Sequence, residues 1–190
     1  MKNMRKASIV AVLIITALFM SAGIATAQEE TAEESSNKTL VVLGSILAMV
    51  IAGIASAIGL TLAGTSAIAV TAEKPELFGK LLVLQVLPMT QAVYGLLTAI
   101  LLMMGAGLLG GEAQVTSLMG MGAVLIGLVV GITGISGVNQ GMVASASISA
   151  VGRNPDVAAR GIIFTVMPET IAIFGLLVGI LLMTGLGLLG

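Results

Sequence analysis

One carboxylate lies deep inside an apolar stretch of this sequence. Of the nine acidic residues, eight belong to a polar N-terminal tail or flank a short break between apolar stretches, and Glu169 is the ninth. An ionisable group at membrane depth costs at least ~2.5 kcal/mol, so it normally faces a protein interior and moves an ion or a proton. A protonated glutamate that only stabilises helix packing is the structural alternative. We expect the function of the chain to centre on Glu169.

Three uncharged polar side chains are predicted to lie at the same depth as Glu169. Gln140 precedes the last break between apolar stretches by about as many residues as Glu169 follows it, and Thr90 and Gln91 follow the first break by almost the same distance. At a rise of ~1.5 Å per residue, this distance is about 20 Å. Hard cations require oxygen ligands of this kind. The four side chains therefore predict a cation site, and interhelical hydrogen bonding is the alternative for the uncharged three.

The composition places these residues in a membrane protein and removes several kinds of chemistry. The 190-residue chain is 57% hydrophobic and 9% charged, with a mean hydropathy of +1.15, whereas soluble domains carry about 25% charged residues. Cysteine and histidine are absent, which excludes disulfides, thiol nucleophiles and sites that need imidazole. The net charge of −1 and the lack of tryptophan give no footprint for nucleic acid. We expect no cofactor other than a transported ion.

Four apolar stretches are long enough to cross a membrane as helices, because each exceeds the ~20 residues that hydrocarbon requires. The expected helices are Thr39–Thr71, Glu76–Leu109, Val115–Val151 and Asp156–Leu189. Shifting the sequence by 80 residues aligns the second helix with the fourth, so that Pro88 falls on Pro168. We expect each proline to loosen the helix beside the site. The fold class is therefore an all-α membrane protein of two tandem helical hairpins, residues 39–110 and 111–190, that run parallel to each other.

Glycine is abundant in the predicted spans and indicates close contact between helices. The third helix has glycines four residues apart at Gly127 and Gly131 and at Gly137 and Gly141, a spacing that lets neighbouring backbones approach closely. Two other segments, at the ends of the second and fourth helices, fit a GxGxxG pattern. Neither follows a strand or opens a helix, as nucleotide binding requires. We expect these glycines to end helices.

The first 27 residues have the pattern of a secretory signal peptide. Three basic residues precede an apolar run, and the small residues at 25–27 supply a cleavage pattern. We expect cleavage before Gln28, and a retained fifth helix is the alternative. Residues 28–38 form a polar, acidic segment that we expect to be irregular and outside the membrane.

Basic residues at the two hairpin turns predict the orientation in the membrane. They lie on one side of the predicted bundle, and such residues favour the cytoplasmic side. We therefore expect loops 72–75 and 152–155 to be cytoplasmic and both chain ends to be external, in a multi-pass protein of the cell membrane. The residues concerned are Lys74, Lys80, Arg153 and Arg160.

Several segments resemble the duplicated proteolipid subunit, called c or K, of the membrane rotor of vacuolar-type and archaeal-type rotary ATPases. The resemblance covers residues 39–190 in register. It lies in LPMTQAVYG at 87–95, PETIAI at 168–173, GVNQG at 137–141 and the loop EKPE at 73–76.

The resemblance implies a ring of identical subunits in which the first and third helices form the inner wall and the second and fourth the outer wall. Glu169 matches the ion-carrying carboxylate, and Tyr94 matches a tyrosine that hydrogen-bonds it. Met89 takes the place of the carboxylate in the first hairpin, so each subunit has one carboxylate per four helices. The sodium ligands of the family match the Leu87 carbonyl, Thr90, Gln91, Gln140 and Glu169.

The resemblance also implies a non-catalytic role and a set of partners. Partner subunits would synthesise or hydrolyse ATP, a stator subunit with a basic residue would release the ion, central-stalk subunits would contact the cytoplasmic loops, and lipid would surround the ring. We expect sodium as the coupling ion, because a proton needs only the carboxylate and one hydrogen-bond partner. The alternatives are the same ring with protons and a small stand-alone channel or transporter gated around Glu169.

Overall fold

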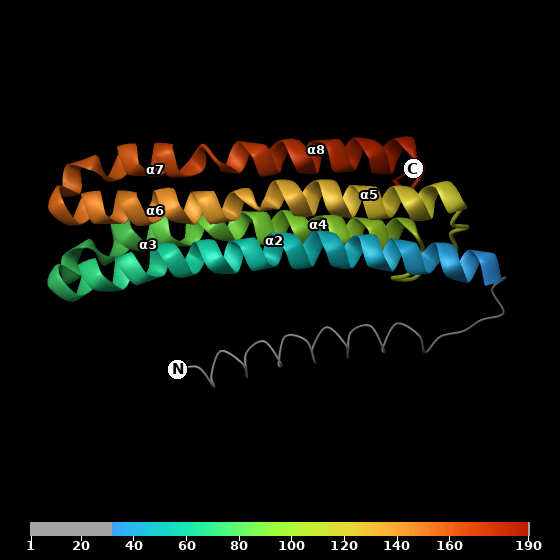
Figure 1. Ribbon diagram of the computed structural model, residues 1–190, viewed down its shortest axis with the longest axis horizontal. Helices are drawn as coiled ribbons and strands as arrows, with labels where there is room; N and C mark the ends of the chain where they lie inside the picture. Colours follow the sequence, from blue (N-terminus) through green and yellow to red (C-terminus); the bar gives the residue numbers. More distant parts are fainter. Residues whose placement is uncertain (1–31, 190) are drawn as a thin grey trace, which may run out of the picture. The chain divides into compact units, whose positions relative to one another are not determined.

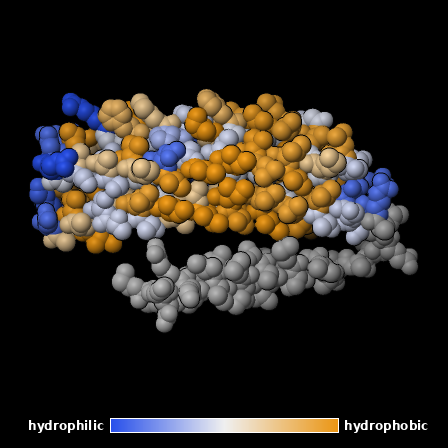
Figure 2. Space-filling model, viewed as in Figure 1, coloured by the Kyte–Doolittle hydropathy of each residue, from blue (hydrophilic) through white to orange (hydrophobic). Residues whose placement is uncertain are grey.

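The computed structural model describes residues 32–189 and shows four long helical rods that lie side by side (Figure 1). Hydrophobic side chains cover the middle of the visible face, and hydrophilic ones gather at its two ends (Figure 2). Within the described part of the chain, four helices are long and apolar enough to cross a membrane, and they are Glu33–Glu73, Pro75–Gly105, Ser117–Arg153 and Pro155–Gly185. The predicted fold class, an all-α multi-pass membrane protein, is therefore confirmed.

Most rods consist of several helical pieces. The first rod is the single helix α2 (Ala32–Glu73). The second consists of η1 (Pro75–Leu77), α3 (Phe78–Val86), η2 (Leu87–Met89) and α4 (Thr90–Gly105). The third consists of α5 (Ser117–Gly134) and α6 (Ser136–Arg153). The fourth consists of η3 (Pro155–Val157), α7 (Ala158–Val166) and α8 (Glu169–Gly185).

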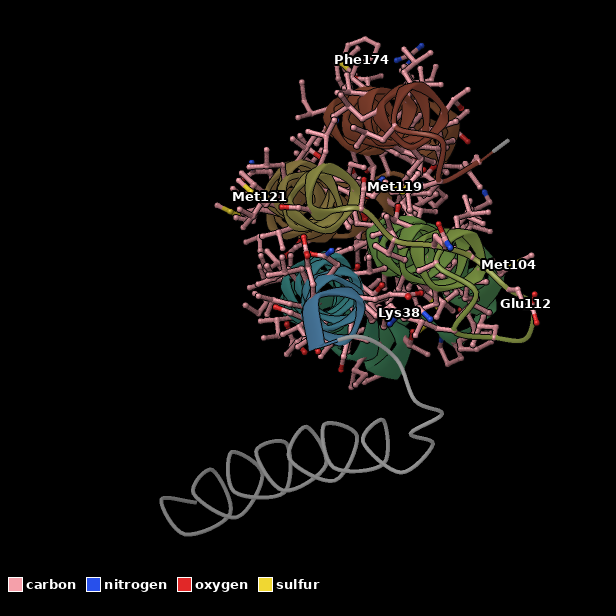
Figure 3. The ribbon with its side chains drawn as sticks, turned by 90° about the vertical axis from the view of Figure 1, so that its right-hand side faces the viewer. Lys38, Met104, Glu112, Met119, Met121 and Phe174 are labelled. Carbon is pink, nitrogen blue, oxygen red and sulfur yellow. The ribbon has the colours of Figure 1, made fainter. Side chains whose placement is uncertain are left out.

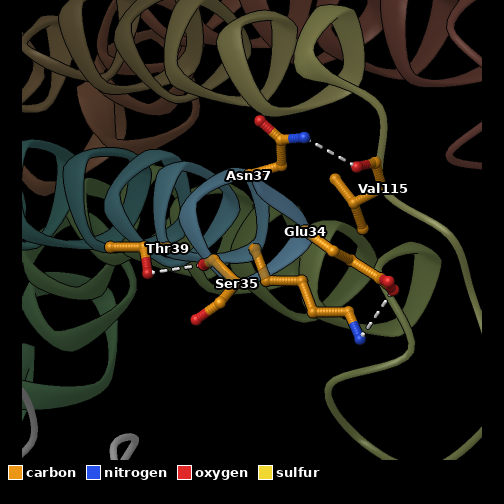
Figure 4. A network of polar contacts seen from close by, with 6 residues as sticks. Glu34, Ser35, Asn37, Thr39 and Val115 are labelled. Carbon is orange, nitrogen blue, oxygen red and sulfur yellow. Dashed lines mark hydrogen bonds and ion pairs between the residues drawn. The ribbon is translucent and has the colours of Figure 1, made fainter. Parts of the chain in front are cut away.

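The first rod begins earlier than expected and includes residues 32–38, which we predicted to be irregular. Lys38 forms an ion pair with Glu34, one helical turn earlier, at 3.4 Å. Asn37 is buried, and its side-chain amide donates a 3.0 Å hydrogen bond to the carbonyl of Val115 (Figure 4). These contacts extend the helix into the polar segment, so the prediction of irregular structure there is wrong. The predicted signal peptide and the start of the polar segment lie outside the described residues.

Three of the rods change their helical geometry in the middle. Pro88 lies in η2, and Pro168 lies between α7 and α8. Both prolines interrupt the regular α-helix, because proline has no N–H to donate to the carbonyl four residues before it. The third rod has a break that we did not predict. Ile135 separates α5 from α6, and its N–H donates to the carbonyl of Ile132, three residues earlier, at 3.1 Å.

The GxGxxG segments end α4 and α8, as the sequence predicts. Gly107 and Gly187 have φ angles of +70° and +74°, in the left-handed region that favours glycine. After each of these glycines, the N–H of the following leucine donates to the carbonyl five residues earlier at 2.9 Å. This Schellman arrangement satisfies carbonyls at the helix end. The glycines therefore act as helix caps.

Glycine also brings α2 into close contact with the third rod. A Cβ atom at Gly127 would overlap the backbone of Gly44, and one at Gly141 would overlap the backbone of Gly59. Backbone-to-backbone contact of this kind is typical of membrane helices that pair through small residues. The predicted close packing of the first and third helices is therefore observed.

The hairpin turns contact each other, and the sides of the bundle are apolar. At the end of the hairpin turns, Lys74 Nζ donates a 2.6 Å hydrogen bond to the carbonyl of Gly152, which ties the two turns together. Figure 3 looks along the bundle from the opposite end, and in this view Met121 of the third rod and Phe174 of the fourth rod point outward from the bundle. They are 59% and 60% exposed, so apolar side chains face the surroundings of the bundle.

Candidate ion-binding site

Glu169 is the first residue of α8, directly after the proline break. Its side chain is 8% exposed, so the carboxylate lies inside the bundle although an apolar exterior surrounds it. The hydroxyl of Tyr94 in α4 donates a 2.7 Å hydrogen bond to Oε1 of Glu169. The break at Pro168 therefore places the carboxylate at the start of α8, inside the bundle and within reach of α4.

A chain of hydrogen bonds connects the other carboxylate oxygen to the first hairpin. Gln140 Nε2 in α6 donates to Oε2 of Glu169 at 3.3 Å. Gln91 Nε2 in α4 donates in turn to Oε1 of Gln140 at 2.7 Å. Both glutamines are fully buried. Three side chains that we predicted to lie at one depth are thus in contact, and they come from both hairpins.

Thr90 lies at the edge of this chain. Its hydroxyl donates to the carbonyl of Leu87 at 3.1 Å and lies 3.4 Å from Oε1 of Gln91. Leu87 belongs to η2, and in this tighter turn its carbonyl also accepts the backbone N–H of Thr90, three residues later. The proline break therefore brings a hydroxyl, a backbone carbonyl and an amide oxygen close together. Together with Glu169, these oxygen atoms have the character of hard-cation ligands.

A glycine leaves the space that Gln91 fills. A Cβ atom at Gly137 would lie 3.2 Å from Oε1 of Gln91 and 3.4 Å from the backbone nitrogen of Ser56. The contact with Gln91 is tight enough that its amide would have to shift slightly, and in a densely packed interior such a shift is transmitted to the next side chain. The glycines of α6 therefore serve the polar site as well as helix packing.

The first hairpin has no comparable carboxylate site. Met89 takes the position that corresponds to Glu169 under the 80-residue shift, and its side chain is 50% exposed. Leu60 and Phe174 take the positions that correspond to Gln140 and Tyr94. Tyr94 of the first hairpin and Gln140 of the second both contact the carboxylate of the second hairpin.

One residue of the site was missed from the sequence. Ser56 of α2 is 2% exposed, and its Oγ accepts a 2.9 Å hydrogen bond from the backbone N–H of Ala92. We had interpreted the small residues of the first helix as packing residues only. The signal that could have revealed it was depth, because Ser56 precedes Pro75 by about as many residues as Ala92 follows it.

The sequence matches the protein family described as the C subunit of ATP synthase. The match occurs twice, over residues 43–102 and 104–182. The two matched ranges correspond to the two hairpins. The duplication inferred from the 80-residue shift therefore agrees with two tandem copies of one family unit.

Curated relatives include archaeal, bacterial and animal proteins. The K subunit of the A-type ATP synthase of Methanocaldococcus jannaschii is 46% identical over 72% of this chain, and the match spans 60% of that longer relative. The K subunit of the V-type sodium ATPase of Enterococcus hirae is 38% identical over 74% of this chain and 88% of the relative. The 16 kDa proteolipid of the V-type proton ATPase of Rattus norvegicus is 30% identical over 75% of this chain and 90% of the relative.

Proposed function

The chain belongs to the family of the ATP synthase C subunit, and we propose that it carries sodium ions across a membrane on Glu169. It is a non-catalytic proteolipid subunit of the rotor of an A-type or V-type rotary ATPase. Ion flow through the ring would be coupled to ATP synthesis or hydrolysis in other subunits. The observation that carries the proposal is the buried hydrogen-bonded chain from Gln91 through Gln140 to Glu169.

The oxygen atoms around Glu169 favour a cation as the transported species. A sodium ion would replace its hydration shell with the Leu87 carbonyl, the Thr90 hydroxyl, the amide oxygens of Gln91 and Gln140, and the carboxylate. A proton needs only the carboxylate and one partner, and Tyr94 already supplies that partner at 2.7 Å. In a proton ring the other polar groups would serve only to hydrogen-bond one another between the helices. Sodium gives each of them a role.

The two glutamine amides allow the same site to hold a bare carboxylate and an ion. Gln140 directs its NH₂ group at Glu169, which stabilises the anion. Rotation of both glutamine amides by half a turn exchanges Nε2 for Oε1 in each, so that Gln140 presents an acceptor to the site and its NH₂ group donates to Oε1 of Gln91. We infer that amide rotation accompanies sodium binding, since donors suit the empty site and acceptors suit the occupied one.

The proposed cycle follows from the cost of an exposed charge in lipid. An anionic Glu169 that faces lipid is strongly disfavoured, so it holds its ion while the ring rotates. At a stator subunit, a basic residue and an aqueous path would let the ion leave. The membrane potential contributes about 2.3 kcal/mol per charge per 100 mV and biases the direction of rotation.

The orientation remains part of the proposal. Loops 72–75 and 152–155 carry basic residues beside them and would face the cytoplasm, where central-stalk subunits would contact them. The hydrogen bond from Lys74 to the Gly152 carbonyl holds the two loops together as one surface. The N-terminus and the C-terminus would lie on the external side.

Protons are the second candidate, because one relative is named a sodium ATPase subunit and another a proton ATPase subunit. A stand-alone channel or transporter is not retained, since membership of the rotor family accounts for the duplicated hairpins. The two ions make different demands on the residues around the carboxylate. Competition between sodium and protons at Glu169 therefore decides between them.

The experiment measures protection of Glu169 in the purified ring. A hydrophobic carbodiimide modifies the carboxyl group, and bound sodium should block the reaction. The sodium concentration for half-protection should rise as the pH falls, because protons compete for the same oxygen atoms. Gln140→Leu should weaken protection while leaving the carboxyl group reactive. If the extent of modification stays the same from micromolar to molar sodium, at a pH where the reagent works, the ring carries protons.

A further inference from the structure

Ser56 is a buried hydroxyl on the helix that contributes none of the proposed sodium ligands. It lies on α2, it is 2% exposed, and its Oγ accepts a 2.9 Å hydrogen bond from the N–H of Ala92. Ala92 directly follows Gln91 in the first turn of α4. The bond therefore reaches from the first rod to the backbone that carries two proposed ligands.

The N–H of Ala92 belongs to a helix start that lacks a cap of its own. The first N–H groups of a helix have no intrahelical partner, and a serine, threonine, asparagine or aspartate before the helix usually accepts from one of them. The residue before α4 is Met89, and within the described residues it makes no side-chain cap hydrogen bond. Inside a membrane an unpaired N–H is costly. Ser56 supplies the missing acceptor from a different helix.

The acceptor on Ser56 lies beside the proposed ligands. Gln91 is fully buried, and the site of a Cβ at Gly137 lies within 3.4 Å of both its amide oxygen and the backbone nitrogen of Ser56. The first turn of α4 is consequently enclosed between α2 and α6. We propose that Ser56 is a positioning residue that fixes the start of α4 and so sets the sodium affinity of Thr90 and Gln91. This inference rests on the sodium site proposed above.

The second hairpin contains a natural comparison for this role. Under the 80-residue shift, Ser136 corresponds to Ser56 and Ala172 to Ala92. Ser136 is 7% exposed, and its Oγ has no hydrogen-bond partner among residues 32–189. The start of α8 presents Glu169 rather than uncharged ligands. The two serines have similar burial, but among the described residues only Ser56 accepts a hydrogen bond from the start of the following helix.

The test compares Ser56→Ala with Ser136→Ala in the intact ring, using carbodiimide modification of Glu169 and its protection by sodium. Ser56→Ala leaves the N–H of Ala92 without its acceptor, so the sodium concentration for half-protection should rise roughly tenfold. The pH dependence of modification without sodium should stay unchanged, because Tyr94 and Gln140 still contact the carboxylate. Ser136→Ala should match the wild type in both measurements. If Ser56 only stabilised the fold, Ser56→Ala would change both the sodium concentration for half-protection and the pH dependence of modification without sodium.

Each outcome decides a separate claim. If the wild-type ring shows no sodium protection, the proposed sodium site fails before Ser56 is considered. If the wild type is protected and Ser56→Ala behaves like it, or if Ser136→Ala shifts equally, the positioning role is wrong. Ser56→Cys keeps a side chain of similar size with a weaker acceptor. It replaces Ser56→Ala in the protection measurement if the alanine variant does not assemble into a ring. Its half-protection should shift in the same direction, and a wild-type value for this variant overturns the proposal.

Discussion

The hydroxyl of Tyr94 and the carboxylate of Glu169 are joined by a 2.7 Å hydrogen bond between residues that lie 75 positions apart in the chain. The bond links the second rod to the fourth at the break where α8 begins. Gln140 contacts the other carboxylate oxygen from the third rod. A single carboxylate is thus held by side chains from both copies of the duplicated hairpin.

Replacing Tyr94 with Phe removes the hydroxyl and keeps the ring. The hydroxyl fixes the carboxylate where it meets the other proposed ligands, and a hydrogen bond to a charged group contributes about 1.5–3 kcal/mol, so the sodium concentration for half-protection of Glu169 should rise by up to roughly tenfold. The assembled ring should remain intact, because the aromatic packing is kept. The control is Phe174→Leu, since Phe174 takes the corresponding place in the second hairpin and is 60% exposed. Equal effects of the two variants would contradict a specific role for the hydroxyl.

Replacing Glu169 with Gln should separate assembly from transport. Glutamine has nearly the same shape and no charge, so the ring should assemble, whereas ion-driven ATP synthesis and ATP-driven ion uptake should be lost. Both are measured with the whole complex in sealed vesicles. Thr170→Ala changes the neighbouring residue, whose hydroxyl donates to the local Met167 carbonyl at 2.8 Å, and it should keep activity. Transport at the wild-type rate by Glu169→Gln would show that the carboxylate carries no ion.

A methyl group at Gly141 should weaken the contact between α2 and α6. A Cβ there would overlap the backbone of Gly59, so the two helices must separate. We expect Gly141→Ala to lower the stability of the ring by roughly 1–3 kcal/mol, the usual cost of overpacking. Gly79→Ala is the matched control, because a Cβ at Gly79 meets nothing within 4 Å in the described chain. Thermal dissociation of the purified ring should occur at a lower temperature for the Gly141 variant alone.

Much of this arrangement was predictable because depth in a membrane can be counted along the sequence. Equal distances from the hairpin turns placed Gln91, Gln140 and Glu169 at one level, and the structure connects them by hydrogen bonds. Glycines spaced four residues apart indicated the close contact of the first and third helices. Both patterns depend on helical geometry alone, which a long apolar helix keeps.

Other features depend on contacts between rods, so they could not be predicted by counting residues from the turns. The helix at residues 32–38 is extended by the bond from Asn37 to a carbonyl after the second rod. The break at Ile135 contains no proline from which it could be predicted. The contact of Ser56 with Ala92 depends on the rotation of α2 about its axis, and a serine among alanines does not reveal that rotation.

Introducing a carboxylate at Met89 tests whether the surroundings make the site. Met89 corresponds to Glu169 under the 80-residue shift, yet its side chain is 50% exposed. The positions that match Gln140 and Tyr94 are Leu60 and Phe174, so neither an amide nor a phenol is available to the new group. A carboxylate left without such partners in lipid should stay protonated and bind no sodium.

The Met89→Glu ring should therefore react with carbodiimide at two places per subunit and be protected by sodium at one. Mass spectrometry of peptides from the modified ring distinguishes the two carboxyl groups. Adding Leu60→Gln and Phe174→Tyr supplies the two missing partners, and sodium protection at the introduced carboxylate should then improve. Protection by sodium in the single Met89→Glu variant, at the concentration that protects Glu169, would mean that depth alone creates the site. The polar chain from Gln91 to Glu169 would then stabilise the bundle without selecting the ion.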